Sequence, residues 1–435
     1  MNKRVLIITY YWPPSGGSGV QRWLKMVKYL RSFGWEPIVY TAEGGEVPAI
    51  DLSLEKDVPK GIEVIRYPIW EPYSLYKKLI GQKKEQRINT GFLSETAKPK
   101  LKEKLSVWIR GNFFIPDARC FWIKPSVKFL TNYLLEKPVD AIVSTGPPHS
   151  MHLIAQGVVQ KINIPWLADF RDPWTDIDFY DQLMLTQRAD AKHKRLEKGV
   201  LTRATEVVTV SWNWAADFKK IVNRPIEVIT NGFDEDDFKT EAVDLYEGFL
   251  FHHIGAMNKD RNPHNFWKAL GEICKTNSAF ASDLKIKLTG KNDFSVIQSI
   301  REHGLEQFTE LVEYLPHQEV VRSLMRSPLL LLPLNDTPNT LGIIPGKLFE
   351  YLAAKRPIFA IGNLKGDTAR IINEVKAGSM VGFTDYEATK NAILKFYADY
   401  KNGRLKLESD TMIDKYSRKN CTGQIAELLN KITSK

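Results

Sequence analysis

The sequence predicts an α/β fold with two doubly wound domains, and three observations support this prediction. Short β-branched runs alternate with amphipathic stretches along the whole chain, a pattern typical of parallel strands joined by crossover helices. The 435 residues are more than a single hydrophobic core usually holds. The alternation also stops at an acidic stretch over residues 235–247 and then begins again, which places a domain boundary there.

The first predicted domain covers residues 1–235. It begins with a strand over residues 5–10 and a helix over residues 20–33, whose apolar side chains recur on one face. Further strands of this domain are predicted at residues 37–41, 62–67, 141–144, 165–169, 206–210 and 226–229.

The second predicted domain covers residues 248–415, and a last helix covers residues 416–431. No strand follows this helix in the sequence, so it is free to pack on either domain. Strands of the second domain are predicted at residues 249–254, 284–289, 311–314, 329–332, 357–361 and 379–381.

The composition indicates an anionic partner. The formal net charge is +10, which suits nucleic acid, an acidic membrane face or a phosphorylated small molecule, and charge alone does not select among them. The three cysteines, Cys120, Cys274 and Cys421, are far apart and odd in number, which argues against a disulfide framework and fits a reducing compartment. No apolar run approaches the roughly 18 residues of a membrane span, so a cytoplasmic protein is expected.

A basic insertion interrupts the first domain at about residues 70–125. Between residues 75 and 110 there are ten Lys or Arg against three Glu, interleaved with apolar and aromatic side chains. Such a stretch can lie on an anionic membrane surface. A solvated helical insertion, whose apolar face belongs to the core, explains the same pattern equally well.

A glycine-rich loop, YYWPPSGGSGVQR at residues 10–22, follows the first strand. Gly16, Gly17 and Gly19 allow a close backbone approach, and the next helix directs its amide end at the same place. The loop matches neither the Walker A pattern nor the dinucleotide fingerprint. It predicts an anion or sugar-phosphate cradle, although tight packing of strand on helix would also require glycines.

Two later loops bring chemically active side chains to the same edge of the sheet. TGPPHS at residues 145–150 supplies His149, and DFRDPW at residues 169–174 supplies Asp169, Arg171 and Asp172. Carboxylates and an imidazole beside a phosphate loop suit proton transfer and stabilisation of a leaving phosphate. Helix caps or ordinary ion pairs would account for the same residues.

The second domain repeats the arrangement of glycine turns and cations. GAMNKDR at residues 255–261 includes Lys259 and Arg261, and Gly290 follows the next strand. A Pro-Gly turn then leads into a helix with Gly346, Lys347 and Glu350 at its start. The backbone amides of this turn and Lys347 could bind phosphate, and Glu350 could accept hydrogen bonds from ribose hydroxyls. Lys347 and Glu350 could equally form an ion pair on the surface of the helix.

These motifs resemble those of GT-B glycosyltransferases of the family 4 type, in which two Rossmann-like domains face each other across a cleft. VITNGFD at residues 228–234 is similar to the element that closes the first domain in that family. The family's diphosphate-binding lysine falls on Arg261, its arginine falls on Ala256, and Lys259 or Lys347 would compensate. LGIIPGKLFEYLAAKRPIFAIG at residues 341–362 places the ribose-binding glutamate on Glu350, whereas the family's first glutamate falls on Gly342.

The resemblance also implies roles in the first domain. Gly16, Gly17 and Gly19 would lie against the transferred sugar and its phosphates. Arg171 occupies the place of a frequent catalytic histidine, and Asp169, with His149 nearby, would be a polar group at the reacting sugar. Residues 416–435 would cross back onto the first domain.

The implied reaction transfers a sugar from a nucleotide diphosphate sugar to a hydroxyl of a saccharide or lipid-linked saccharide. The resemblance implies retention of configuration, no cofactor and no metal, and a role in cell-surface polysaccharide or glycolipid synthesis at the inner face of a membrane. Two alternatives stay open: a sugar-nucleotide 2-epimerase, and a non-catalytic binder of anionic lipid or nucleic acid. Nucleic acid is not expected, because the basic residues concentrate in one insertion.

Overall fold

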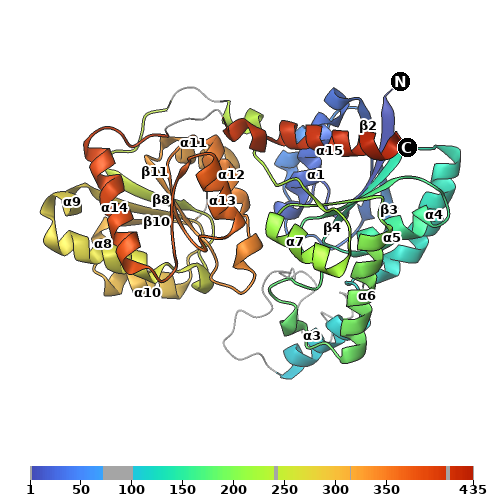
Figure 1. Ribbon diagram of the computed structural model, residues 1–435, viewed down its shortest axis with the longest axis horizontal. Helices are drawn as coiled ribbons and strands as arrows, with labels where there is room; N and C mark the ends of the chain where they lie inside the picture. Colours follow the sequence, from blue (N-terminus) through green and yellow to red (C-terminus); the bar gives the residue numbers. More distant parts are fainter. Residues whose placement is uncertain (1, 72–100, 240–242, 314, 408–411, 435) are drawn as a thin grey trace. The chain divides into compact units, whose positions relative to one another are not determined.

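The computed structural model describes residues 2–71, 101–239, 243–313, 315–407 and 412–434. The chain forms two compact units, which are coloured by sequence in Figure 1. Unit 1 comprises Met1–Thr230 and Arg418–Lys435, and unit 2 comprises Asn231–Ser417. Much of the predicted basic insertion, residues 72–100, lies outside the described residues, so its proposed contact with a membrane stays a prediction.

Unit 1 is built on a sheet of parallel strands in the order β3-β2-β1-β4-β5-β6-β7. The order reverses between β1 and β4, and loops at the carboxyl ends of such neighbouring strands form the usual ligand site of this architecture. The strands are β1 Lys3–Ile8, β2 Trp35–Glu43, β3 Glu63–Pro68, β4 Ala141–Gly146, β5 Trp166–Phe170, β6 Glu206–Thr209 and β7 Glu227–Val228.

Helices cover both faces of this sheet, because its strands are apolar on both sides. In β1, Leu6 and Ile8 belong to one hydrophobic cluster while Val5 and Ile7 belong to another. The helices of unit 1 are α1 Ser18–Leu30, α3 Leu101–Phe113, α4 Cys120–Glu136, α5 Ser150–Val159, α6 Gln187–Arg203, α7 Trp212–Ile221 and α15 Arg418–Thr433, with short 3₁₀ turns at Arg31–Phe33, Leu52–Asp57 and Asp181–Leu183.

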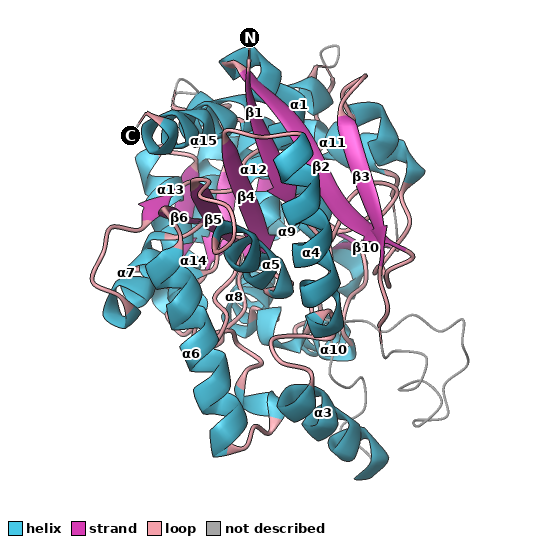
Figure 2. Ribbon diagram, turned by 90° about the vertical axis from the view of Figure 1, so that its right-hand side faces the viewer, coloured by secondary structure: helices cyan, strands magenta, loops and turns pink. Residues whose placement is uncertain are grey.

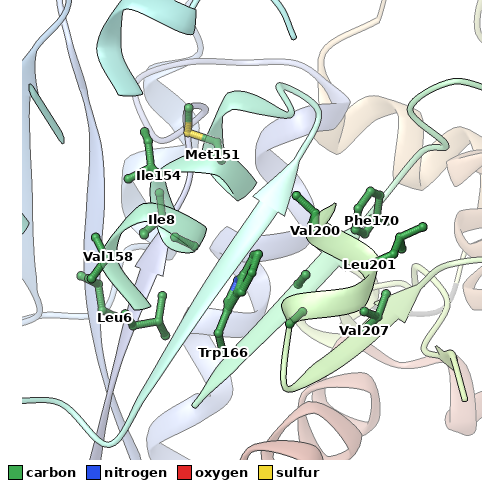
Figure 3. Packing of buried hydrophobic residues seen from close by; sticks show 14 of the residues in the cluster. Leu6, Ile8, Met151, Ile154, Val158, Trp166, Phe170, Val200, Leu201 and Val207 are labelled. Atoms are coloured by element: carbon green, nitrogen blue, oxygen red, sulfur yellow. The ribbon is translucent and has the colours of Figure 1, made fainter. Parts of the chain in front are cut away.

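One of the two clusters joins the sheet to α5 and α6. Figure 3 shows Leu6 and Ile8 of β1 and Trp166 of β5 together with side chains of these two helices. Ile154 and Val158 of α5 are one helical turn apart, so both face the sheet. This packing fixes α5 and the carboxyl-terminal end of α6 relative to the strands.

The other cluster includes the final helix. Ile425, Leu429 and Ile432 of α15 recur at helical spacing and pack in the same cluster as Trp23 and Val27 of α1. Figure 1 shows α15 beside α1, with the carboxyl terminus in unit 1. The last helix is therefore part of the core of unit 1, although nearly 200 residues of sequence of unit 2 precede it.

Unit 2 has the same architecture, with parallel strands in the order β10-β9-β8-β11-β12-β13. Its strands are β8 Phe249–Ile254, β9 Leu284–Thr289, β10 Thr309–Val312, β11 Leu329–Pro333, β12 Ile358–Ile361 and β13 Gly378–Val381. Its helices are α8 His264–Thr276, α9 Ser278–Asp283, α10 Phe294–Glu302, α11 His317–Arg326, α12 Gly346–Ala353, α13 Asp367–Glu374 and α14 Tyr386–Lys401, with 3₁₀ turns at Glu235–Phe238, Lys259–Arg261, Glu306–Phe308, Thr340–Gly342 and Ile413–Tyr416.

The predicted fold class is confirmed, because both units are parallel sheets with helices on their faces. A face-to-face arrangement of the two domains across a cleft stays a prediction. Within the described part of the chain, no helix combines the length and the apolar character that a membrane crossing needs.

Replacing Leu429 by alanine tests the contribution of α15 to unit 1. Leu429 is fully buried, so we expect Leu429→Ala to lower the free energy of unfolding by about 2–5 kcal/mol. Gln424→Ala changes an exposed position of the same helix and serves as the control. Equal midpoints for both variants in urea denaturation would contradict the packing of α15 described here.

Candidate functional site

The glycine-rich loop of unit 1 lies between β1 and α1, and backbone hydrogen bonds fix its course. The amide of Gly16 donates to the carbonyl oxygen of Ala49 (2.9 Å), and the amide of Asp51 donates to that of Pro14 (2.8 Å). A Cβ atom on Gly16 would lie 3.0 Å from the Cβ of Asp51, which leaves little room for a side chain. Gly17 has a φ of +96° and directly precedes α1. The amino end of α1 therefore opens at the carboxyl edge of the sheet, where anions commonly bind.

Asp169, at the end of β5, is fully buried. Its carboxylate accepts hydrogen bonds from Arg22 Nη2 (3.0 Å), Trp23 Nε1 (2.7 Å) and Thr145 Oγ1 (2.9 Å). Burial acts to raise the pKa of Asp169, but the charge of Arg22 and the hydrogen bonds together lower it below its ordinary value. The carboxylate is therefore ionised, and its hydrogen bonds all go to groups inside unit 1. This burial does not fit the predicted role of Asp169 at a reacting sugar.

Arg22 shows why Asp169 is needed in the interior. The Arg22 side chain is almost fully buried, and it also donates to the carbonyl oxygens of Ile229 (2.9 Å) and Thr230 (2.8 Å). The ion pair thus ties α1 and β5 to the segment that follows β7. A buried guanidinium without a carboxylate would be strongly destabilising.

Arg171 joins the loops at the carboxyl edge of unit 1. Its guanidinium donates to the carbonyl oxygens of Gly19 (2.5 Å), Gly146 (3.3 Å) and Pro147. These carbonyls belong to the start of α1 and to the end and following loop of β4. The structure therefore places Arg171 as a connection between the predicted glycine loop and the loop that carries His149.

A cavity of about 400 Å³ lies at this edge of unit 1, a size typical of small-molecule sites. Its wall comes from the loops after β1, β4 and β5 and from the neighbourhood of α3 and α6, which lie side by side in Figures 1 and 2. The lining residues include Tyr11, Arg110, His149, Asp172, Trp174 and His193, but neither Asp169 nor Arg171.

An aromatic and histidine network forms one side of this cavity. The ring of His149 stacks on Trp174 with 4.7 Å between ring centroids and an angle of 5°. Trp174 Nε1 donates to His193 Nδ1 (3.0 Å), and the Trp174 amide donates to the buried carboxylate of Glu197 (3.1 Å). His193 and Glu197 are one turn apart on α6, so this helix sets the position of the loop after β5.

Burial keeps the histidines of this network neutral. It lowers the pKa of His149 well below the ordinary value, and the charge of Arg171 acts in the same direction. Burial also lowers the pKa of His193. Both rings therefore bind as neutral imidazoles, with one N–H donor and one acceptor each.

In unit 2 the predicted cations meet at the turn after β8. Lys347 Nζ lies 3.5 Å from the carbonyl oxygen of Ala256, and Arg261 Nη1 donates to the same oxygen (2.8 Å). The glycines make this possible, because a Cβ on Gly255 would lie 2.5 Å from Lys347 Nζ. A Cβ on Gly290 would likewise lie 2.8 Å from the carbonyl carbon of Gly255.

A buried histidine holds Lys347 in place. Lys347 Nζ lies 3.3 Å from His253 Nε2, while His253 Nδ1 lies 3.0 Å from the carbonyl oxygen of Leu331. Because a carbonyl oxygen only accepts, Nδ1 carries the proton and Nε2 accepts from Lys347. Burial, assisted by the charge of Arg261, lowers the pKa of Lys347 to about 7, whereas Glu350 acts to raise it.

The other predicted residues of unit 2 lie on the same elements. Gly346 is the first residue of α12 and is exposed, Glu350 is half-buried one turn further, and Lys259 is exposed at the start of the turn that contains Arg261. Among the described residues, no group of three or more His, Cys, Asp or Glu side chains is arranged to hold a metal ion.

Sequence reasoning did not assign His193 or His253. His253 lies two residues before Gly255, near the end of the predicted strand at residues 249–254, and could have been noticed from that position. No local signal marks His193, because only the packing of α6 brings it to Trp174.

Replacing Asp169 by alanine tests its assignment to the interior. We expect Asp169→Ala to lower the free energy of unfolding by about 3–5 kcal/mol, because Arg22 is left buried without its carboxylate. The control, Asp190→Ala, removes a more exposed ion pair with Lys194 and should change stability by about 1 kcal/mol or less. Similar urea midpoints for the two variants would contradict the assignment.

Comparisons with known proteins identify the fold. No protein-family model and no curated protein matches the sequence. Sucrose-phosphate synthase from Thermosynechococcus elongatus has a TM-score of 0.64 at 13% identity, with 99% of each chain covered. HepE from Anabaena, solved in complex with UDP, also has a TM-score of 0.64, at 15% identity, covering 99% of this chain and 100% of its own.

Further neighbours share the fold at lower similarity. WaaG, a glycosyltransferase involved in lipopolysaccharide biosynthesis, has a TM-score of 0.56 at 13% identity, with 99% of this chain and 100% of WaaG covered. A putative UDP-N-acetylglucosamine 2-epimerase from Listeria monocytogenes reaches 0.50 at 10% identity, covering 99% of this chain and 96% of its own. Two parallel sheets and matches over the whole chain show that this protein has the GT-B fold of glycosyltransferases.

Proposed function

We propose that this protein is a glycosyltransferase that moves a sugar from a nucleotide diphosphate sugar to an acceptor hydroxyl. The observation that carries the proposal is the convergence of Lys347 and Arg261 on the carbonyl oxygen of Ala256. This cation pair lies at the glycine turns of unit 2, within a fold whose neighbours include HepE bound to UDP. We infer that UDP is the leaving nucleotide.

The proposed leaving group explains the chemistry of unit 2. A departing nucleoside diphosphate gains negative charge as the glycosidic bond breaks, and fixed cations and amides stabilise that charge. Lys347, Arg261 and the amides at the start of α12, from Gly346 onward, supply both kinds of group. Gly255 and Gly290 leave the backbone open to the phosphates, and Glu350 would accept from ribose hydroxyls. We infer that these cations do the work of a metal, so the reaction is metal-independent.

The cavity of unit 1 is the proposed acceptor site. Its mixture of aromatic and polar side chains suits a saccharide or a lipid-linked saccharide. WaaG acts in lipopolysaccharide biosynthesis, and we extend that setting to cell-surface polysaccharide or glycolipid synthesis for this chain. Retention of configuration is proposed from the resemblance, and proton NMR of the product's anomeric signal would test it.

A sugar-nucleotide 2-epimerase is the second candidate, favoured by the neighbour from Listeria monocytogenes. The two reactions differ in their products, because a transferase releases nucleoside diphosphate when an acceptor is added. An epimerase interconverts nucleotide sugars without needing an acceptor. Release of UDP that depends on the acceptor would support the transferase.

Thermal unfolding with a panel of nucleotides tests the proposed function. We expect UDP to raise the Tm of the full chain through binding to the folded state. Lys347→Met should weaken UDP binding about 10- to 100-fold, the effect of losing one charged hydrogen bond. The control is Lys395→Met at an exposed position of α14. It removes one positive charge, as Lys347→Met does, and should bind UDP as the wild type does. No stabilisation by any nucleoside diphosphate or nucleotide sugar would overturn the proposal.

The lowered pKa of Lys347 predicts proton uptake on UDP binding. With a pKa of about 7, Lys347 is partly neutral between about pH 7 and pH 8, and the phosphates should restore its charge by raising that pKa. Binding should therefore weaken as the pH rises above about 7. Calorimetry in buffers of different ionisation enthalpy measures the uptake. In the Lys347→Arg variant the side chain is always charged, so UDP binding should take up no proton at this position. Equal proton uptake in the wild type and this variant would contradict the prediction.

A further inference from the structure

Arg110 is a cation in the wall of the unit 1 cavity. It lies near the end of α3, is half-buried and lines the cavity. Among the residues that the structure describes, its guanidinium has no hydrogen-bond or salt-bridge partner. The wall contains a second guanidinium, that of Arg119, which is paired with the carboxylate of Glu71 (2.8 Å) and lies 4.3 Å from the ring centroid of Tyr10. Arg119 is therefore committed to the protein, whereas the charge of Arg110 is not.

The end of α3 that carries Arg110 is fixed beside α6, and Figures 1 and 2 show the two helices side by side. A Cβ atom on Gly111 would lie only 2.7 Å from the carbonyl oxygen of Leu183, so glycine allows α3 to pack directly on this segment. The side-chain oxygen of Asn112 accepts from the amide of Thr186 (2.7 Å), the residue that caps the start of α6. These contacts hold the backbone of Arg110 at the cavity wall without engaging its side chain.

The acidic side chains and histidines of the wall do not neutralise Arg110. Burial keeps His149 and His193 uncharged. Asp117 accepts from the amide (2.9 Å) and the hydroxyl (2.8 Å) of the first residue of α5. Asp172 is half-buried in the same wall, and within the described parts of the chain no salt bridge joins it to Arg110. The cavity therefore offers a guanidinium to an anion and, separately, a carboxylate that accepts from hydroxyls.

Binding of an anion would stabilise Arg110. A half-buried guanidinium has lost part of its hydration, and a neutral ligand would displace more water without supplying a counter-charge. The oxygen atoms of a phosphate or a carboxylate match the planar guanidinium and form charge-assisted, often bidentate, hydrogen bonds with it. The cavity therefore favours a ligand that carries an anionic group together with hydroxyls.

Resting on the proposed function, we propose that Arg110 selects an acceptor saccharide that bears an anionic group, a phosphate or a carboxylate, by binding this group through its guanidinium. The sugar ring lies against the aromatic side chains of Tyr11 and Trp174, and one of its hydroxyls donates to Asp172. Arg110 is then a specificity-determining residue, which acts on acceptor binding and not on bond making. A phosphate can belong to a phosphorylated sugar or to the link between a saccharide and a lipid.

Calorimetric titration of the full chain at saturating UDP tests this selection. UDP fills the cation site of unit 2, so the anionic group of a probe reports on unit 1. The probes are methyl β-D-glucoside, which is neutral, methyl β-D-glucuronide, which has a carboxylate, glucose 6-phosphate, and geranyl phosphate as a lipid phosphate. We expect at least one anionic probe to bind about 10- to 100-fold more tightly than the neutral glucoside, the effect of one charged hydrogen-bonded pair. The anionic probe that binds most tightly identifies the source of the anion.

Arg110 variants test whether this preference depends on the guanidinium. Arg110→Met removes the charge and should abolish the preference, while the affinities for the neutral glucoside and for UDP stay unchanged. Arg110→Lys keeps the charge without the bidentate geometry and should retain part of the preference. Arg195→Met, at an exposed position of α6, is the matched control and should keep the wild-type preference. All three variants should keep the wild-type midpoint in urea denaturation, because neither side chain has a partner among the described residues.

Steady-state release of UDP separates acceptor binding from chemistry. UDP-sugars serve as donors and the preferred anionic saccharide serves as the acceptor. Arg110→Met should raise the acceptor KM about 10- to 100-fold and leave kcat largely unchanged. A fall in kcat with an unchanged acceptor KM would contradict the assignment of Arg110 to acceptor selection.

The outcomes distinguish this inference from the function on which it rests. A wild-type chain that binds no UDP and transfers no sugar from any donor would overturn the proposed function, whatever the effect of Arg110. Wild-type binding of UDP together with equal affinities for the anionic and neutral probes would overturn the inference alone. An Arg110→Met chain that keeps the wild-type preference for the anionic probe would also overturn it.

Discussion

The buried ion pair between Arg22 and Asp169 is the interaction on which the functional edge of unit 1 depends. It joins the first turn and a half of α1 to the end of β5 and, through Arg22, to the segment after β7. Two buried charges are tolerated only because each is surrounded by further hydrogen bonds. With these elements fixed, Arg171 can hold the loops after β1 and β4 together, and the cavity wall keeps its shape.

The two units use charge in opposite ways. In unit 1 the buried guanidinium is neutralised by a carboxylate and serves the architecture. In unit 2 Lys347 rests on a neutral histidine and a carbonyl oxygen, so its charge is not cancelled by these two contacts. An incompletely neutralised cation beside glycine turns favours an anionic ligand, and this contrast explains why we place the nucleotide in unit 2 and the acceptor in unit 1.

Much of the fold could be predicted from local patterns. Residues 5–8 and 249–251 are apolar on both faces, as central parallel strands usually are. The structure contains β1 at Lys3–Ile8, two residues earlier than the predicted 5–10, and β8 at the predicted residues 249–254. The glycine turns at Gly17, Gly255 and Gly290 were also found, because a positive φ or a close approach leaves glycine as the only comfortable choice. The convergence of Lys347 and Arg261 is consistent with the donor role that the resemblance implied for both.

The sequence by itself therefore determined the alternation of strands and helices, the glycine turns and the set of polar residues at the strand ends, since these depend on neighbours along the chain. Only the tertiary structure decided that the carboxylate of Asp169 is paired with Arg22 in the interior, whereas Asp172 lines the cavity. Asp169 and Asp172 are three residues apart, yet one meets Arg22, 147 residues away, and the other lines a cavity that His193 of α6 also lines. Contacts between segments that are distant in the sequence leave no pattern in the local sequence. Those contacts decide which charged side chain is buried in an ion pair and which lines a cavity.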